Sequence, residues 1–208
     1  MTLLIDMAES GWLPDRLIRF GIRQLDRKRL REENHGQSVE QGPDLGSFIA
    51  EMHQSPIAMK THKANEQHYE VPPAFFEQVL GRHLKYSGCY WPDGVESLDR
   101  AEETMLDLTC RRANLTDGMK ILELGCGWGS LSLWMATHYP DSQITAVSNS
   151  SLQREYIQSK MAEHNLKNLR VITADMNDYS IDQQFDRVVS VEMFEHMRNW
   201  PLLLERIS

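Results

Sequence analysis

Two glutamates and a histidine in one short segment, "VEMFEHM" (191–197), are the residues of this chain that most directly suggest chemistry. Carboxylates and imidazoles accept and donate protons in enzymes, so Glu192, Glu195 and His196 are candidate catalytic residues. The segment could also be the start of a solvated helix, or Glu-x-x-Glu-His could present metal ligands on one helical face. Because it lacks the first histidine of an H-x-x-E-H motif and no cysteine or histidine cluster accompanies it, we expect no metal site.

A glycine-rich segment, "ELGCGWG" (123–129), ends one predicted strand and opens a helix. Gly125 and Gly127 allow a tight turn and let the backbone approach a ligand closely at the carboxyl edge of a sheet. The spacing is not G-x-G-x-x-G and no G-K-[ST] follows, so a phosphate-binding loop is poorly supported. Plain turn chemistry is the alternative to a ligand site.

Polar residues follow the next two predicted strands. Ser148 and Asn149 offer neutral hydrogen-bonding groups where a dinucleotide enzyme usually carries an acid. Gln153 either contacts a ligand or completes a capping box for the following helix, and the two roles are compatible. The third strand ends at Asp175 and Met176, where a carboxylate can accept from an exocyclic amine and a methionine can pack on a base. A helix cap is the alternative for Asp175.

The elements that would position these residues alternate between strands and helices. Strands are expected over 119–125, 143–148, 169–175 and 185–191, and helices over 130–139, 151–165 and 199–208. Short apolar strands separated by helical segments predict a parallel sheet with crossover helices, the doubly wound α/β class. Because such a sheet normally has more than these four strands, we expect the chain to be truncated after the fourth.

A further helix is expected over 97–112, just before the first strand. Its predicted apolar stripe consists of Leu98, Ala101, Met105 and Leu108. Asp99 and Glu102 resemble a capping box at its start.

The N-terminal part differs in character, and we expect residues 1–64 to be a helical extension and connector before a core over 65–208. Pro14 marks the start of a basic amphipathic helix, and a short helix is expected around "GSFIAEMH" (46–53). The basic helix could pack on its own domain or on a partner subunit, which is the favoured interpretation, or lie on an anionic membrane surface. The sequence does not decide whether these helices form a homodimer.

Composition excludes several classes of function. The net charge of −8 argues against nucleic acid as the main partner, because a phosphate backbone selects basic surfaces. No apolar run approaches the roughly 20 residues that span a bilayer, and the N-terminus lacks the pattern of a secretory signal. The three scattered cysteines suit a reducing compartment, so a cytoplasmic location is expected.

The chain resembles one family of S-adenosylmethionine-dependent methyltransferases in several motifs taken together. The motifs are "ELGCGWGSL", "SNSSLQ", "TADM" and "VEMFEHM", with "ANEQHYEVPPAFF" and "HLKYSGCYWPDG" upstream. This family groups the cyclopropane fatty acid synthases with the coclaurine-type N-methyltransferases, and the resemblance covers about residues 10–208. It implies a Rossmann-like class I methyltransferase sheet and S-adenosylmethionine as cofactor.

The resemblance also implies roles for residues that match the family's motifs. It places Tyr86 and Ser87 at the methionine end of the cofactor, Gly125 and Gly127 beneath it, Ser148, Asn149 and Gln153 at the ribose and adenine, and Asp175 with Met176 at the adenine edge. A sulfonium suits aromatic faces, for which Trp128, Tyr86 and Phe194 are available.

Two departures bear on the methyl acceptor. Cyclopropane synthases carry a cysteine directly after the Tyr-Ser pair, where this chain has Gly88, and typically a glycine at the position of Glu192. Both departures favour the nitrogen of a small amine over the double bond of an unsaturated lipid. An amine must lose a proton before it attacks, so Glu195 and His196 are expected to take that proton while Glu192 binds the ammonium or orients His196. A cofactor-binding module without turnover is the remaining alternative.

Overall fold

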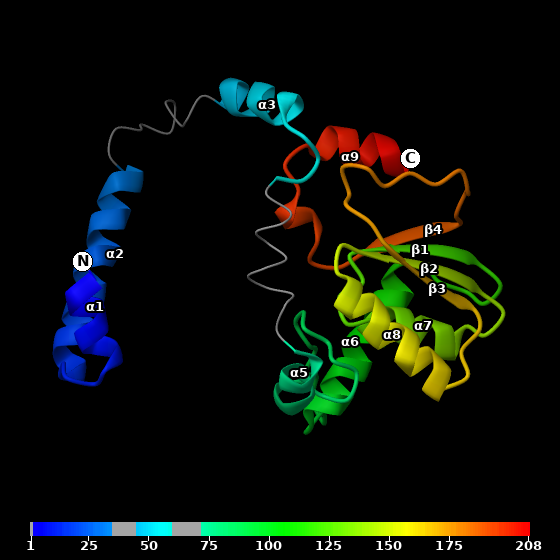
Figure 1. Ribbon diagram of the computed structural model, residues 1–208, viewed down its shortest axis with the longest axis horizontal. Helices are drawn as coiled ribbons and strands as arrows, with labels where there is room; N and C mark the ends of the chain where they lie inside the picture. Colours follow the sequence, from blue (N-terminus) through cyan, green and yellow to red (C-terminus); the bar gives the residue numbers. More distant parts are fainter. Residues whose placement is uncertain (1, 35–44, 60–71) are drawn as a thin grey trace. The chain divides into compact units, whose positions relative to one another are not determined.

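The computed structural model describes residues 2–34, 45–59 and 72–208, which form two compact units, residues 1–50 and 51–208. The boundary expected between residues 64 and 65 lies outside the described residues. We treat the two units separately (Figure 1).

The first unit contains the helices expected near the N-terminus. They are α1 (Thr2–Glu9), α2 (Asp15–Asn34) and the first part of α3 (Leu45–Gln54). The long helix α2 begins directly after Pro14, and Asp15 in its first turn accepts a hydrogen bond from Arg19 Nε at 2.7 Å. An acidic residue in the first turn and a basic one, Arg31, in the last both suit the helix dipole. None of the helices in the described part of the chain is long and apolar enough to cross a bilayer.

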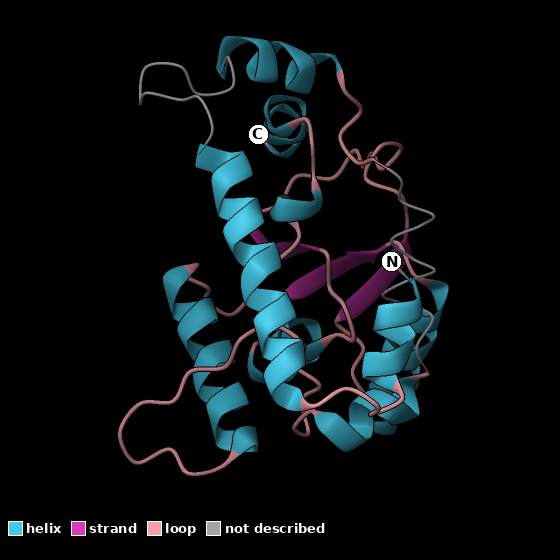
Figure 2. Cartoon of the chain, turned by 90° about the vertical axis from the view of Figure 1, so that its left-hand side faces the viewer, coloured by secondary structure: helices cyan, strands magenta, loops and turns pink. Residues whose placement is uncertain are grey.

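The second unit is built on a four-stranded parallel sheet, as expected. Its strands are β1 (Lys120–Leu124), β2 (Gln143–Ser148), β3 (Leu169–Thr173) and β4 (Arg187–Ser190), in the order β3-β2-β1-β4. Leu124 pairs with Val147 and with Ser190, and Ser148 pairs with Thr173. This register brings the carboxyl ends of the strands to one edge of the sheet, and Figure 2 shows the strands gathered side by side.

Helices cover both faces of the sheet, so β1 is buried on both sides. One face packs against α6 (Leu98–Arg112), α7 (Ser130–His138) and α8 (Ser151–Glu163), while α9 (Trp200–Ile207) packs on the other. Side chains alternate along the strand: Ile121 belongs to the first cluster, and Leu122 with Leu124 to the second. The doubly wound α/β class predicted from the strand–helix alternation is confirmed.

Helix α6 differs from expectation in two respects. Its N-cap is Ser97, whose hydroxyl accepts from Arg100 N, so Asp99 and Glu102 do not form a capping box. Its inward face carries Ala101, Leu106 and the fully buried Glu102.

The predicted stripe was therefore only partly right, because Leu98 is exposed and Met105 and Leu108 are only half-buried. A glutamate occupies the inward face because its two carboxylate oxygens accept hydrogen bonds from three backbone amides of residues 81–85. The donors are the amides of Gly81, His83 and Lys85, at 3.0, 2.8 and 3.1 Å. Periodicity alone could not find this arrangement, because the donors lie about 20 residues earlier in the chain.

Gly129 is the N-cap of α7 and has a left-handed backbone conformation, with φ +83°. A Cβ added here would lie 2.6 Å from Cγ1 of Ile157, which is fully buried on α8. The glycine therefore permits both the turn into α7 and the close packing of α7 against α8.

We predict that Gly129→Ala lowers the free energy of unfolding by about 2–4 kcal/mol, because backbone strain and overpacking add together. Gly118→Ala is the matched control, since Gly118 has φ +86° but nothing within 4 Å of an added Cβ. It should cost only the strain, about 1 kcal/mol. Urea denaturation of both variants measures the difference, and equal losses would show that the contact with Ile157 contributes nothing.

Candidate active site at the carboxyl edge of the sheet

A pocket of about 230 Å³ opens at the carboxyl edge of the sheet. Every site residue predicted from the sequence lines this pocket, with the exceptions of Glu195 and the aromatic candidate Phe194. The lining residues among the predicted set are Tyr86, Ser87, Gly125, Gly127, Ser148, Asn149, Gln153, Asp175, Met176, Glu192 and His196. The structure thus brings together segments that lie up to about 110 residues apart in the sequence.

The glycine loop forms the floor of the pocket. The amides of Gly125 and Cys126 both donate to the carbonyl of Val147, at 2.9 and 3.0 Å, which ties the loop to the end of β2. A Cβ on Gly125 would lie 2.8 Å from Cβ of Met193, so a side chain here would collide with the segment that follows β4. An added Cβ on Gly127 would meet nothing within 4 Å, which leaves its surroundings open.

The end of β2 carries a hydrogen-bonded set of polar side chains. The Ser148 hydroxyl donates to Gln153 Oε1 at 2.6 Å and accepts from the Ser150 amide at 3.1 Å. Ser150 also caps α8, because its hydroxyl accepts from Gln153 N at 3.3 Å. Only half of the predicted capping box forms, because the Ser150 amide bonds Ser148 and the buried Gln153 side chain bonds Ser148 instead of the Ser150 amide.

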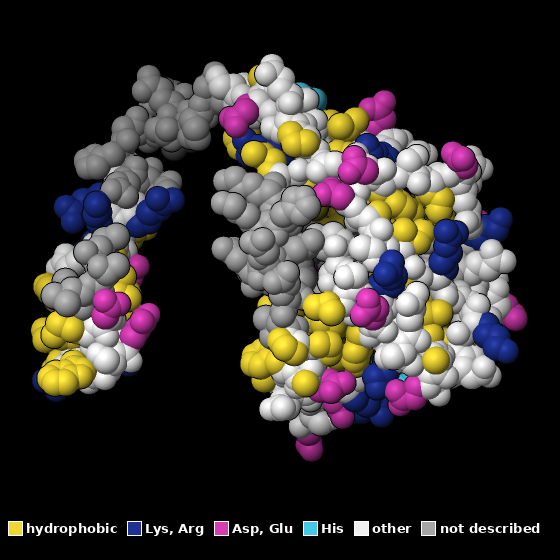
Figure 3. All heavy atoms as spheres, in the orientation of Figure 1, with side chains coloured by type: hydrophobic (Ala, Val, Ile, Leu, Met, Phe, Trp, Pro, Cys, Tyr) yellow, Lys and Arg dark blue, Asp and Glu magenta, His cyan; other side chains and the backbone are white. Residues whose placement is uncertain are grey.

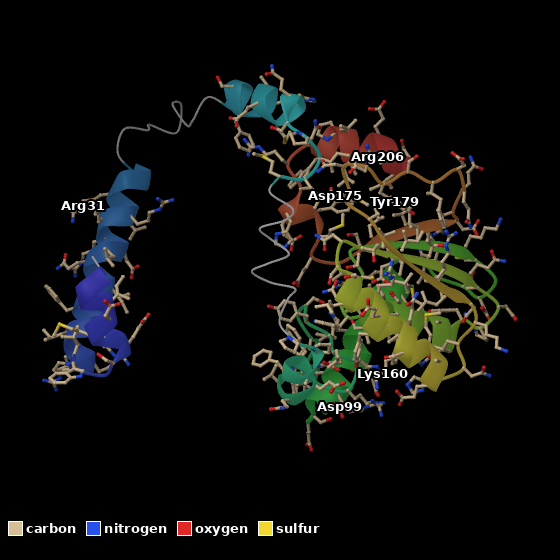
Figure 4. The ribbon with its side chains drawn as sticks, viewed as in Figure 1. Arg31, Asp99, Lys160, Asp175, Tyr179 and Arg206 are labelled. Carbon is tan, nitrogen blue, oxygen red and sulfur yellow. The ribbon has the colours of Figure 1, made fainter. Side chains whose placement is uncertain are left out.

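The segment after β3 is held by helix α9. Asp175 Oδ1 accepts from the Asn177 amide at 2.8 Å, which makes a local turn at the strand end. The Arg206 guanidinium of α9 donates to the backbone carbonyls of Met176, Asn177 and Tyr179. Figure 4 shows Asp175, Tyr179 and Arg206 close together beside α9. This clamp fixes where Asp175 and Met176 meet the pocket.

The segment after β4 places the candidate catalytic residues. Glu192 has φ +53°, a left-handed conformation that a glutamate rarely adopts, and its Oε1 accepts from the Gly88 amide at 3.4 Å. Phe194–His196 form a single 3-10 turn, in which Glu195 and His196 are both exposed but only His196 lines the pocket. Of the three candidate catalytic residues, two therefore share the pocket and Glu195 does not. Among the residues that the structure describes, no cluster of metal-ligating side chains is present.

Aromatic residues form one wall of the pocket. Trp128 is buried and lies 5.1 Å from Phe76 and 5.5 Å from Tyr156 between ring centroids. Tyr86 packs edge-on against Phe76 but is 63% exposed. Apolar side chains gather on the surface over α5 (Pro73–Val79) in Figure 3, so this side of the pocket continues into an apolar surface. Phe194, the third aromatic candidate, packs instead in the apolar cluster beneath α9.

Two charged residues of the pocket were missed from the sequence. Glu123 is a buried carboxyl on β1 that accepts a hydrogen bond from the Ser132 hydroxyl. Burial raises the pKa of Glu123 to about 7, and the Ser132 hydrogen bond opposes this shift only in part. Its position among the apolar residues of "ILEL" was a signal that could have found it. Lys85 is buried beside Ser87, and nothing in the spacing around it indicated this position.

Comparisons with known proteins agree on one family. The family model described as "Mycolic acid cyclopropane synthetase" matches residues 58–207. The (S)-coclaurine N-methyltransferase of Thalictrum flavum subsp. glaucum is 38% identical over 205 residues, which cover 99% of this chain and 57% of that protein. The cyclopropane-fatty-acyl-phospholipid synthase of Escherichia coli (strain K12) is 37% identical over 133 residues, covering 64% of this chain and 33% of that protein.

A solved structure gives the same result. The crystal structure of coclaurine N-methyltransferase bound to N-methylheliamine and SAH matches with a TM-score of 0.86 and 36% sequence identity. The match covers 99% of this chain and 59% of that one. The chain thus spans somewhat less than three fifths of the length of the N-methyltransferases that it matches.

The raised pKa of Glu123 predicts a pH dependence of stability. Between pH 4.5 and about 7 this carboxyl is ionised in the unfolded chain but protonated in the folded one, so unfolding releases a proton. Stability should therefore fall as pH rises through this window, by roughly 3 kcal/mol relative to Glu123→Gln. Urea denaturation at several pH values measures this change in the free energy of unfolding. Glu163→Gln, on the surface of α8, is the control in which the free energy of unfolding should still fall with pH. Parallel curves for the wild type and Glu123→Gln would contradict the prediction.

Proposed function

The chain belongs to the mycolic acid cyclopropane synthetase family, and on this basis we propose that it is an S-adenosylmethionine-dependent N-methyltransferase acting on a small amine. Relatives named for methyl transfer to coclaurine match along almost the whole chain, whereas the cyclopropane synthase of E. coli matches over about two thirds of it. The coclaurine N-methyltransferase of the matching solved structure is bound to SAH. The preference for an amine inferred from Gly88 and Glu192 agrees with the longer matches to N-methyltransferases.

The donor set of the pocket fits S-adenosylmethionine. Ser148, Asn149 and Gln153 offer neutral hydrogen-bonding groups for a ribose and an adenine, and Asp175 can accept from an exocyclic amine. The aromatic wall at Trp128 suits the positive charge of a sulfonium. When bound, the cofactor supplies the methyl group.

Glu192 and His196 are the groups we assign to the acceptor side. An amine arrives protonated at neutral pH, and the Glu192 carboxylate can hold the ammonium at the pocket wall. The His196 imidazole can then take the proton, which frees the lone pair on nitrogen for in-line attack. Glu195 is exposed outside the pocket lining, so its catalytic role has less structural support than those of the other two.

One observation carries the proposal: Glu192 and His196 line the same pocket as the residues expected to hold the cofactor. Methyl transfer needs donor and acceptor side by side, since alignment of the two supplies much of the rate. Glu192 and His196 are exposed as well as lining the pocket, so the support comes from their position beside the expected cofactor residues and not from burial.

The proposal is tested by titrating S-adenosylmethionine into the protein calorimetrically and by assaying methyl transfer to a panel of secondary amines and unsaturated phospholipids. We expect binding and turnover of an amine. Turnover of the lipid alone would favour a cyclopropane synthase, and binding without any turnover would favour a cofactor-binding module.

His196→Ala should slow amine methylation by about 100-fold while the affinity for S-adenosylmethionine changes little, because the imidazole acts on the acceptor's proton. Glu195→Ala is the comparison variant and should have the smaller effect, since its side chain lies outside the lining. Steady-state kinetics with parallel calorimetry separate the two quantities. Unchanged turnover in both variants would contradict the assignment of a proton acceptor to this turn.

The strained backbone of Glu192 predicts opposite effects on stability and activity. Glu192→Gly should raise the free energy of unfolding by about 0.5–1 kcal/mol, because glycine accepts φ +53° without strain but loses more entropy on folding. The same variant should methylate amines at least about tenfold more slowly, since it lacks the carboxylate. Asn165→Gly, with φ +52° in the exposed turn just after α8, is the control that leaves turnover unchanged. A Glu192→Gly variant with full activity would exclude Glu192 from acceptor binding.

Contact of α2 with a membrane surface, self-association and a cytoplasmic location stay predictions from the sequence pattern. Liposome co-sedimentation, analytical ultracentrifugation and cell fractionation would test them.

A further inference from the structure

Lys85 is a buried cation inside the pocket, and the methyl-transfer steps above do not use it. The residue is 4% exposed, and its ammonium donates a hydrogen bond to the Ser87 hydroxyl. Among the described residues that line the pocket, it is the one lysine or arginine, whereas Glu123, Asp175 and Glu192 are all acids. Burying an ammonium is costly unless a partner compensates it, so its position requires an explanation.

The segment that carries Lys85 is fixed by buried hydrogen bonds. The Lys85 amide donates to Glu102 Oε1 at 3.1 Å, and Glu102 also holds the amides of Gly81 and His83. A Cβ on Gly81 would lie 2.6 Å from the Glu102 carboxylate, so the chain approaches α6 as closely as only glycine permits. The backbone that presents the ammonium to the pocket is therefore held independently of any ligand.

Burial and nearby acids act in opposite directions on the Lys85 ammonium. Burial lowers the pKa of Lys85, and the groups that oppose this shift are Cys89, Glu192 and Glu102. The Glu102 oxygens are already occupied by backbone amides, and Glu192 accepts from Gly88. The ammonium donates its hydrogen bond to Ser87, a neutral hydroxyl, so Glu192 and Glu102 favour its charge through their fields and not as hydrogen-bond partners.

S-adenosylmethionine carries one carboxylate, on its methionine part. A pocket that encloses a carboxylate must offer it a cation or several donors, and the acidic residues of this pocket cannot. Ser87 is expected at the methionine end of the cofactor, and Lys85 is bonded to Ser87. The location of Lys85 and its positive charge therefore both suit the carboxylate of the cofactor.

We propose that the Lys85 ammonium, together with the Ser87 hydroxyl, binds the α-carboxylate of S-adenosylmethionine and so orients the methionine end of the cofactor. This inference rests on the proposed function. It adds a binding residue that distinguishes the intact cofactor from analogues without a carboxylate.

The test compares two ligands and two proteins by isothermal titration calorimetry. The ligands are S-adenosylmethionine and decarboxylated S-adenosylmethionine, which keeps the adenosine, the sulfonium and the amine. Lys85→Met preserves the length of the side chain and removes its charge. Lys120→Met removes a charge from the exposed amino end of β1, at the opposite edge of the sheet, and is the matched control.

We expect the wild type and Lys120→Met to bind the intact cofactor roughly 10- to 100-fold more tightly than the decarboxylated one. Lys85→Met should lose this preference, with the affinity for the decarboxylated ligand changed less than about threefold. An equal loss for both ligands would overturn the proposal, because it would show that Lys85 only supports the fold.

The wild type alone also tests the inference if Lys85→Met does not fold, which circular dichroism would reveal. Equal affinity of the wild type for the two ligands would overturn the role of Lys85 while leaving the methyltransferase function intact. Binding of neither ligand would overturn the proposed function and this inference together.

Discussion

The carbonyl of Val147 accepts hydrogen bonds from two consecutive amides, those of Gly125 and Cys126, and the arrangement of the site depends on this interaction. It closes the glycine loop onto the end of β2, so the floor of the pocket and the Ser148–Gln153 pair become one rigid edge. The parallel register then brings β3 and β4 to the same edge, because Ser148 pairs with Thr173 and Leu124 with Ser190. The first residues beyond each strand therefore meet in one pocket.

Two buried glutamates show how the same side chain serves different ends in different surroundings. Glu102 is compensated by three backbone amides and organises the segment that leads to Tyr86 and Ser87. Glu123 receives one hydroxyl hydrogen bond, so burial dominates and raises its pKa to about 7. The first carboxylate is structural, while the second faces the pocket, where a cationic ligand would favour its ionised form.

Most of the fold was predictable because its elements have strong local signals. Apolar runs bounded by turn residues marked all four strands, and the helices expected over 151–165 and 199–208 are found as α8 and α9. Helix α6 was predicted in extent but not in its inward face, because Glu102 is satisfied by amides about 20 residues away. The site residues were predicted from their positions at strand ends, yet spacing could not show that His196 lines the pocket and the neighbouring Glu195 does not.

The sequence by itself determined the α/β class, the order of the elements and the glycine loop, since these follow from hydrophobic periodicity and turn chemistry along neighbouring residues. The tertiary structure alone decided that Lys85 is a buried cation beside Ser87 and that Glu192 is held in a left-handed conformation with its carboxylate at Gly88. Both depend on contacts between residues far apart in the chain. Burial and charge pairing are properties of that three-dimensional packing, so no local pattern encodes them.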